Sequence, residues 1–251
     1  MTIATHRFAA RDGTVLAWHE TGQGRPVVLV HGLFSNAQVN WIKFGHAGRL
    51  ASAGFRVIMP DMRGHGESAA PHDPAAWPAD VLATDGLDLI AHLALAPGAF
   101  DLGGYSLGGR TALRMVLAGA RPRRLAIAGM GLGGMLDTGA RAAHFRHVLT
   151  NIGRHPRGSP EFLAEAFLRT NGGDPQAMLA LLGSFVDTDA SALAELDLPT
   201  LVVAGIDDDD NGGAPALANA LPFAEYRSIP GNHMSAVARP ELGDTLQAFF
   251  R

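Results

Sequence analysis

Cysteine is absent from this 251-residue chain. Its absence excludes disulfide bonds, zinc sites built on thiolates and a cysteine nucleophile, so covalent catalysis would have to use another side chain. Long apolar runs are also lacking: no stretch approaches about 18 consecutive apolar residues, and residues 1–13 contain no apolar segment behind a basic start. We therefore expect a cytoplasmic protein with no membrane partner.

The chain also has no excess of basic residues. It contains 20 Lys and Arg against 24 Asp and Glu, for a formal net charge of −4, and these charges are scattered. Binding to a phosphate backbone needs a basic face, so nucleic acid is not an expected partner. Hydrophobic residues make up 47% of the chain, which is enough for a sizeable core. We expect a compact enzyme with a small-molecule substrate, and no pattern indicates an oligomeric state.

Short apolar runs rich in β-branched residues recur along the chain, and longer segments with helical periodicity separate most of them. This alternation is typical of βαβ units around a parallel sheet. The expected strands are residues 26–30, 55–59, 99–103, 125–129, 200–205 and 224–229. The expected helices are residues 38–53, 79–94, 107–118, 215–220 and 240–249. The first segment, with Arg11-Asp12-Gly13 between two alternating stretches, predicts an antiparallel hairpin at the sheet edge.

Residues 132–198 interrupt this alternation. They contain no convincing strand, only amphipathic helical pieces split by glycines and prolines. We expect them to form a helical cap inserted into an α/β core made of residues 1–131 and 199–251. The apolar side chains of the insertion are expected to form helix core, and some of them could line a pocket: Phe145, Phe162, Phe167, Met178, Leu181 and Phe185.

A candidate nucleophile lies at Gly104-Tyr105-Ser106-Leu107-Gly108, which matches G-x-S-x-G. Small flanking glycines let a serine occupy a sharp strand-to-helix turn with its hydroxyl exposed. Chance would supply such a match in a chain of this composition about one time in seven, and the glycines could then simply form a turn. Position favours the functional interpretation, because an expected strand ends at Gly103 and a helix-forming segment follows Gly109. Ser106 is therefore the predicted nucleophile.

A serine hydroxyl needs an imidazole to take its proton, and the imidazole needs a third group, usually a carboxylate, to orient it. Of the 11 histidines, His233 combines a loop position with a place after the last expected strand, at the sheet edge that carries ligands. The strand at residues 200–205 runs into four consecutive aspartates, residues 207–210, at the same edge. At least two of these are expected to be solvated. The residues thus predict His233 as the base and leave four candidates for the acid.

These segments together resemble the α/β-hydrolase superfamily over nearly the whole chain. The matching segments are HGL at 31–33, DMRGHGES at 61–68, GYSLGG at 104–109, the aspartates at 207–210 and GNHMSA at 231–236. The chain order of serine, acid and histidine is also the order expected of this family. The resemblance implies an α/β-hydrolase fold, with a mostly parallel central sheet flanked by helices and a small helical cap.

The resemblance narrows the choice of acid. The family commonly places this carboxylate three residues beyond the glycine that ends the preceding strand, which is Asp208 counted from Gly205. Asp207 is the second choice and Asp209 the third.

The resemblance also implies an oxyanion hole made of main-chain N–H groups, here those of Leu33 and Leu107. Leu107 begins the helix whose positive end faces the developing negative charge. Four further motif residues are expected to hold the glycine-rich loops in place rather than to react: His31, Asp61, Arg63 and Ser68.

Two other patterns suggest different chemistry. Gly129-x-Gly131-x-x-Gly134 fits a dinucleotide fingerprint, but it lies in the middle of the chain and not on the first βα turn. Asp207-x-Asp209-x-Asn211-Gly212 reproduces the opening of a calcium loop, but Ala218 stands where the closing glutamate should be. We therefore expect neither a cofactor nor a metal.

Serine at the elbow argues against haloalkane dehalogenases and epoxide hydrolases, which the chain also resembles but which carry aspartate there. We expect an esterase that forms an acyl-serine. The short apolar insertion favours a small-to-medium apolar acyl or alcohol group. The same residues could instead serve a thioesterase, a perhydrolase, an acyltransferase or a carbon–carbon bond hydrolase, and a non-catalytic ligand-binding protein could also keep this fold.

Overall fold

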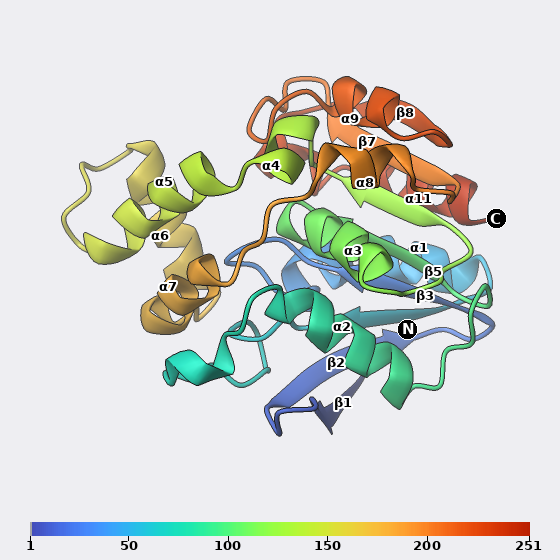
Figure 1. Cartoon of the computed structure of the whole chain (residues 1–251), viewed down its shortest axis with the longest axis horizontal. Helices are drawn as coiled ribbons and strands as arrows, with labels where there is room; N and C mark the ends of the chain where they lie inside the picture. Colours follow the sequence, from blue (N-terminus) through green and yellow to red (C-terminus); the bar gives the residue numbers. More distant parts are fainter. Residues whose placement is uncertain (1) are drawn as a thin grey trace.

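The computed structural model describes residues 2–251 and contains one eight-stranded sheet (Figure 1). The strands are β1 (Ala4–Ala9), β2 (Val15–Thr21), β3 (Arg25–Val30), β4 (Phe55–Pro60), β5 (Asp101–Tyr105), β6 (Leu125–Ala128), β7 (Thr200–Gly205) and β8 (Ala224–Ile229). Their order across the sheet is β1-β2-β4-β3-β5-β6-β7-β8. β1 pairs antiparallel with β2, and β2 with β4, whereas β3 to β8 are mutually parallel. The predicted α/β-hydrolase fold and edge hairpin are confirmed.

Helices cover both faces of the sheet because its strands are apolar on both sides. In β3, Val28 and Val30 join one hydrophobic cluster, and Val27 and Leu29 join another on the opposite face. One face is covered by α1 (His46–Ser52) and α11 (Pro240–Phe250), and the other by α2 (Val81–His92), α3 (Leu107–Leu117) and α9 (Ala214–Ala220). The active-site strands are therefore held in a doubly covered sheet.

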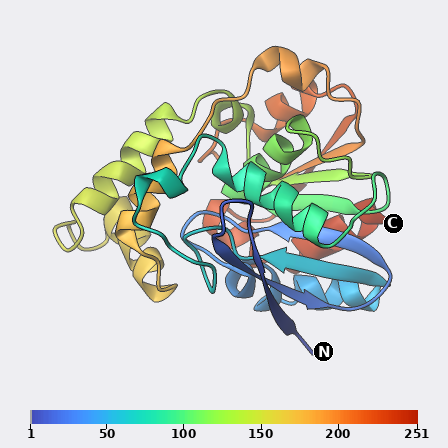
Figure 2. The same ribbon diagram turned by 60° about the horizontal axis from the view of Figure 1, so that its bottom comes forward.

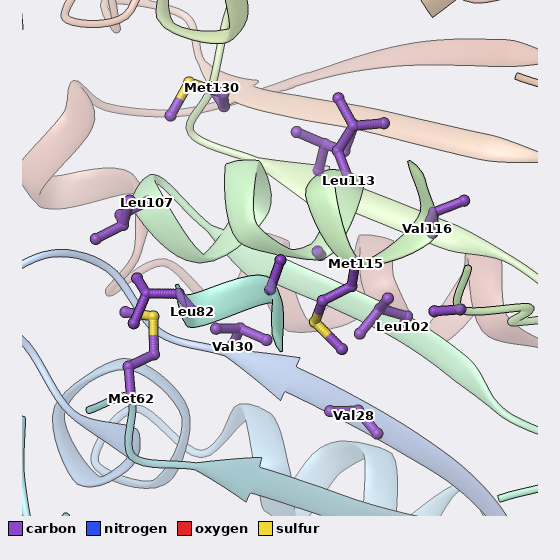
Figure 3. Close-up of a cluster of buried hydrophobic side chains, with 14 of the residues drawn as sticks. Val28, Val30, Met62, Leu82, Leu102, Leu107, Leu113, Met115, Val116 and Met130 are labelled. Carbon is purple, nitrogen blue, oxygen red and sulfur yellow. The ribbon is translucent and has the colours of Figure 1, made fainter. Parts of the chain in front are cut away.

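Helix α3 lies against the middle of the sheet and contacts β3, β5 and β6. Figure 3 shows its side chain Met115 beside Leu102 of β5. Met115 also packs on Gly86 of α2, where an added Cβ would lie 2.5 Å from the methionine sulfur. This close packing fixes the helix that begins directly after Ser106.

The segment at 132–198 is helical throughout its regular parts. It contains α4 (Leu132–Leu136), α5 (Gly139–Thr150), α6 (Pro160–Thr170), α7 (Pro175–Gly183) and α8 (Ala190–Ala194). α5 contacts α6 and α7, and these three project together beyond one end of the sheet (Figures 1 and 2). α4 and α8 instead contact α9. The division into a core and a cap at residues 132 and 198 stays a prediction.

Several element boundaries differ from the sequence prediction, and two of these differences have a structural explanation. The helix expected at 38–53 is split into a π-helical turn (Gln38–Ile42) and α1, with Gly45 in the left-handed region at φ 81° between them. The strand expected at 99–103 runs over Asp101–Tyr105, because pairing with β3 and β6 extends it through two glycines. Short helices occur at Pro74–Ala76 and His233–Ala236. Within residues 2–251, no helix has the length and apolar character needed to cross a membrane.

Candidate active site

The predicted site residues all follow parallel strands at the carboxyl edge of the sheet. Sequence order reverses between β3 and β5, and such a switch point opens a crevice in which α/β proteins bind ligands. Leu33 follows β3, Ser106 follows β5, Asp208 follows β7 and His233 follows β8. The topology therefore brings four distant segments of the chain to one place.

Ser106 occupies a strained turn between β5 and α3, with φ 56° and ψ −121°. The turn is tight enough to exclude side chains at its flanking glycines. A Cβ on Gly104 would lie 2.2 Å from the carbonyl carbon of Gly108, and one on Gly108 would lie 2.1 Å from the oxygen of Val30. The Ser106 N–H donates to the Ala128 carbonyl at 2.7 Å, which ties the turn to β6. The G-x-S-x-G spacing is thus a steric requirement of this turn.

The Ser106 hydroxyl, the His233 ring and the Asp208 carboxylate form a hydrogen-bonded chain. His233 Nε2 lies 2.9 Å from Ser106 Oγ, and His233 Nδ1 lies 3.0 and 3.1 Å from the two Asp208 oxygens. The carboxylate accepts a hydrogen bond from Nδ1–H, which keeps the ring proton on Nδ1 and leaves Nε2 unprotonated, ready to accept the serine proton. The Asp208 side chain is only 3% exposed, whereas Asp207 and Asp209 are exposed. Of the aspartates weighed, Asp208 is the one that the structure places on His233.

The loops after β7 and β8 approach closely enough to bring Asp208 to His233. The Asp207 N–H donates to the Gly231 carbonyl at 3.0 Å, and a Cβ on Gly205 would lie 2.1 Å from that same oxygen. Asn232 caps the short helix that starts at His233 through reciprocal bonds with Ser235. Glycine at the end of β7 therefore permits this contact between the two loops.

Tyr105 contacts the His233 backbone and ring. The sequence did not predict it as a site residue. Its hydroxyl donates to the His233 carbonyl at 2.6 Å, and the two ring centroids lie 5.5 Å apart. Burial raises the pKa of Tyr105, and the nearby carboxylates of Asp208 and Asp210 raise it further, so the hydroxyl stays protonated and donating. Tyr105 occupies a variable position of the G-x-S-x-G pattern, so the motif gives no signal for it.

In the part of the chain that the structure describes, two residues with unbonded main-chain N–H groups line the cavity that contains Ser106. Leu107 is the first residue of α3, where N–H groups lack helical acceptors, and Leu33 lies in the loop after β3. Among residues 2–251, neither N–H makes a hydrogen bond. Both leucines line the same cavity as Ser106. These two groups are available to a ligand oxygen.

Buried histidines hold the loop that contains Leu33. His31 donates from Nδ1 to the Gly32 carbonyl at 2.8 Å and accepts the Met62 N–H at Nε2, 3.0 Å away. His65 accepts the Phe34 N–H at 3.2 Å. Burial lowers the pKa of both rings, that of His65 to about 3, so both are neutral at physiological pH. These contacts agree with the predicted role of His31 in holding the loop in place.

The DMRGHGES segment is fixed by its own polar groups. Asp61 accepts N–H bonds from Ala37 and Glu67, both at 2.8 Å. Burial alone would raise the Asp61 pKa, but bonds from His19 and these N–H groups bring it below its usual value. Ser68 Oγ donates to the Asp61 carbonyl at 2.6 Å. These contacts agree with the predicted role of Asp61 and Ser68 in loop architecture.

Arg63 is buried in the same region, away from Ser106. It donates two hydrogen bonds to Asp85, at 2.7 and 2.9 Å, and one to Asp12 at 2.6 Å. Burial would lower the Arg63 pKa, but the two carboxylates raise it overall. This arginine is paired within the fold, as its predicted structural role requires.

A cavity of about 480 Å³ opens above Ser106 and His233. Its walls are mainly apolar and come from the loop after β3 and from α5 and α6. Of the insertion residues considered for a pocket, Phe145, Phe167 and Phe185 line the cavity. Met178 and Leu181 are instead fully buried in the core. The hydroxyl of Ser106 thus faces a site of ligand size.

The two rival patterns have structural explanations. A Cβ on Gly131 would lie 2.0 Å from the Gly212 carbonyl oxygen, so this glycine-rich segment packs against the loop after β7. The side-chain amide of Asn211 donates to the Gly129 carbonyl at 3.0 Å. This side chain therefore has a structural role in place of the calcium-ligand role that the pattern suggested. Within residues 2–251, no group of three or more histidine or acidic side chains has the arrangement of a metal site.

Comparisons with known proteins identify the family and the fold. Residues 27–242 match the alpha/beta hydrolase family. The fold is similar to a thermophilic esterase from Thermogutta terrifontis, with a TM-score of 0.79 and 24% identity over 100% of this chain and 98% of that one. It is also similar to a hydrolase from Pseudomonas aeruginosa, with a TM-score of 0.78 and 23% identity over 98% of each chain. At these identities, the likeness shows a shared fold.

Curated relatives match over shorter stretches. A non-heme chloroperoxidase from Kitasatospora aureofaciens is 36% identical over 108 residues, which is 42% of this chain and 36% of that protein. Bifunctional epoxide hydrolase 2 from Sus scrofa is 36% identical over 107 residues, which is 43% of this chain and 18% of that protein. The matches thus span well under half the length of these relatives. The family match over most of the chain and the sheet order together show that the chain belongs to the alpha/beta hydrolase family.

Proposed function

We propose that this protein is a serine hydrolase that cleaves a carboxylic ester through an acyl-serine intermediate. Ser106 is the nucleophile, His233 the general base and Asp208 the carboxylate that orients the ring. The observation that carries the proposal is the 2.9 Å contact between Ser106 Oγ and His233 Nε2, with the opposite nitrogen of the ring on Asp208. This arrangement removes a proton from the serine without a cofactor.

The reaction proceeds in two acyl transfers. Ser106 Oγ bonds to the ester carbonyl carbon as its proton passes to His233 Nε2. The tetrahedral intermediate then expels the alcohol, which takes the proton from His233, and leaves an acyl-serine. Water attacks the acyl-serine by the same route and releases the acid, and the proton returns to Ser106. Asp208 stabilises the imidazolium at both stages.

The main-chain N–H groups of Leu33 and Leu107 stabilise the oxyanion in this proposal. Both are free of other hydrogen bonds within residues 2–251, and both leucines line the cavity that contains Ser106. The N-terminus of α3 adds positive potential at the same place. The donors belong to the backbone, so replacing either leucine side chain would leave them in place.

The apolar cavity supports an ester with a small-to-medium apolar acyl or alcohol part. Phe34, Phe145, Phe167 and Phe185 supply much of its wall. Some similar structures are named esterases, and this proposal shares that chemistry. The epoxide hydrolases among the relatives are a poorer guide, because Ser106 stands at the elbow where the resemblance would require aspartate for that reaction.

The names of several relatives favour a second acceptor of the acyl group besides water. Several relatives are named non-heme chloroperoxidases or haloperoxidases. An acyl-serine attacked by hydrogen peroxide instead of water would release a peroxy acid and restore Ser106. Peroxide is therefore the alternative acceptor to test beside water.

The experiment is hydrolysis of p-nitrophenyl esters of graded chain length by wild type and Ser106→Ala, beside a thioester and a peroxide assay. We expect the variant to lose at least about 10³-fold in kcat, as removal of a catalytic nucleophile does. Ser228→Ala, at an exposed position in β8, is the matched control and should retain wild-type rates. Turnover retained in Ser106→Ala would contradict the mechanism.

A further inference from the structure

Arg110 lies one helical turn after the nucleophile and lines the same cavity. Its N–H donates to the Ser106 carbonyl at 3.1 Å, as the fourth residue along α3 should. Side chains on a helix lean toward its N-terminus, so the Arg110 side chain extends back toward Ser106. The residue is nevertheless only 4% exposed. A buried arginine thus lies between the helix and the substrate cavity.

The Arg110 guanidinium has no acidic partner. Within residues 2–251, its only hydrogen bond runs from Nη2 to the Val186 carbonyl, and its buried Nε–H has no acceptor. Its other neighbour is the Phe185 ring, 5.5 Å from the guanidinium carbon. Burial and, to a smaller extent, the neighbouring Arg114 lower the pKa of Arg110 to about 10, so the group is still a cation at neutral pH.

Other arginines in the region are fully paired, which sets Arg110 apart. Arg114, one turn further along α3, donates two bonds to Asp80, at 2.6 and 2.9 Å. Arg141, which also lines the cavity, pairs with Asp210 at 3.2 Å. Asp187 acts on Arg110 only at longer range and accepts the N–H and hydroxyl bonds of Thr138.

An unpaired cation buried beside an apolar cavity is costly unless a ligand supplies the counter-charge. A carboxylate suits this place because it can accept from Nη1, which makes no hydrogen bond within residues 2–251 and is not among the fully buried atoms. We propose that the preferred substrate is an ester that also carries a free carboxylate, and that Arg110 binds this carboxylate while Ser106 attacks the ester carbonyl. This inference rests on the proposed esterase function and names its substrate class.

The fold restricts how far the carboxylate of the substrate can lie from its ester carbonyl. Ser106 and Arg110 belong to one helical turn, so a short chain of about two to four carbons between ester carbonyl and carboxylate would reach from one to the other. The aromatic wall that includes Phe34 and Phe185 would pack against that chain. Monoesters of short dicarboxylic acids have this form.

The test compares kcat/KM for charged and neutral esters of equal length. One series pairs monomethyl succinate, glutarate and adipate with methyl butanoate, pentanoate and hexanoate. A second pairs acetyl esters of short ω-hydroxy acids with propyl and butyl acetate, which places the carboxylate on the alcohol side. In at least one series we expect wild type to prefer the charged ester roughly 10- to 100-fold, as a hydrogen bond to a charged group allows. No preference for the charged ester in either series overturns the proposal.

Variants separate substrate binding from a purely structural role for Arg110. Arg110→Met keeps the length of the side chain without its charge, and we expect the charged-to-neutral ratio of kcat/KM to fall to near one. Arg110→Lys should restore part of the ratio, and Arg114→Met, the matched control on α3, should keep the wild-type ratio. If Arg110 only anchors the Val186 carbonyl, Arg110→Met will lower thermal stability with the ratio unchanged, and that result overturns the proposal.

A binding measurement makes the inference independent of turnover. Titration of Ser106→Ala with glutarate, and with neutral glutaramide as control, is followed by calorimetry. We expect glutarate to bind roughly 10- to 100-fold more tightly than glutaramide, and this advantage to be lost when Arg110→Met is added. Glutarate binding without ester hydrolysis by the wild type would support the anion site while contradicting the esterase function. Ester hydrolysis with neither glutarate binding nor a charged-ester preference would support the esterase function while contradicting the anion site.

Discussion

The His233 imidazole is held at three points. Asp208 fixes the proton on Nδ1, Ser106 lies at Nε2, and the Tyr105 hydroxyl holds the main-chain carbonyl. A base in this position can act only if its ring keeps both orientation and tautomer. Each of the three contacts therefore has a separate experimental consequence.

Replacement of the carboxylate tests the assignment of the acid. Asp208→Asn removes the acceptor that holds the Nδ1 proton, and we expect kcat for ester hydrolysis to fall by about 10⁴. Asp207→Asn, one residue earlier and exposed, should change kcat by no more than a few-fold. Steady-state kinetics of the two variants provide the comparison. Equal losses, or a larger loss in Asp207→Asn, would assign the acid differently.

Replacement of Tyr105 tests the support of the histidine. Tyr105→Phe leaves the His233 carbonyl without its 2.6 Å donor, and we expect kcat to fall about tenfold because the base is less well placed. KM should change little, since the hydroxyl points to the backbone and away from ligand. Tyr226→Phe in β8 is the control and should behave as wild type. Unchanged kcat in Tyr105→Phe would refute the positioning role.

Sequence reasoning predicts residues better when chemistry restricts their identity. Residue type, loop position and strand context were enough to propose Ser106 and His233, whose side chains lie 2.9 Å apart in the structure. Asp208 could be separated from Asp207 and Asp209 only through the family resemblance, because the side chain that meets His233 depends on the turn after β7. Tyr105 and Arg110 carry no motif signal, since their roles arise from contacts that exist only in the folded chain.

At the scale of elements, the turn between β5 and α3 is the most tightly constrained feature. We expect Gly108→Ala to lower the free energy of unfolding by several kcal/mol, because its Cβ would lie 2.1 Å from the Val30 oxygen of β3. Gly183→Ala, at the end of α7 with open space around it, should change stability by no more than about 1 kcal/mol. Urea denaturation measures both. Similar effects in the two variants would show that the turn tolerates a side chain.

The predicted bounds of helices and strands were accurate where apolar runs are continuous, as in β7 and β3. They were less accurate where contacts of the backbone determine where an element begins or ends. The strand β5 ends in Gly103, Gly104 and Tyr105, and glycine has low strand propensity. These residues are extended because β3 and β6 pair with them on both sides. The break at Gly45 likewise depends on how α1 must enter to meet α11.

For the whole molecule, the neutral buried histidines predict how stability depends on pH. The pKa of His65 is lowered to about 3 by burial and by His31, whereas an unfolded histidine titrates near 6.5. Between these values the unfolded chain binds a proton that the folded chain excludes. The contribution of His65 to stability is therefore fully present above pH 6.5 and is lost as pH falls, by about 3 kcal/mol at pH 4.

His65→Asn provides the check, because asparagine can keep one donor and one acceptor without titrating. We expect the free energy of unfolding of this variant to fall less between pH 7 and pH 4 than that of wild type. His92→Asn is the control, because this exposed histidine makes no hydrogen bond or ion pair within residues 2–251, and its free energy of unfolding should fall with pH as that of the wild type does. Parallel curves for His65→Asn and wild type would contradict the neutral state of His65.

If Ser106 is the activated nucleophile of this alpha/beta hydrolase, a serine-directed reagent should label it covalently. The protein is incubated with a serine-directed fluorophosphonate, digested and analysed by mass spectrometry. We expect one adduct per chain, on the peptide that contains Ser106, no adduct in Ser106→Ala and much slower labelling in His233→Ala. An adduct on a different residue, or equal labelling of Ser106→Ala and wild type, would contradict it.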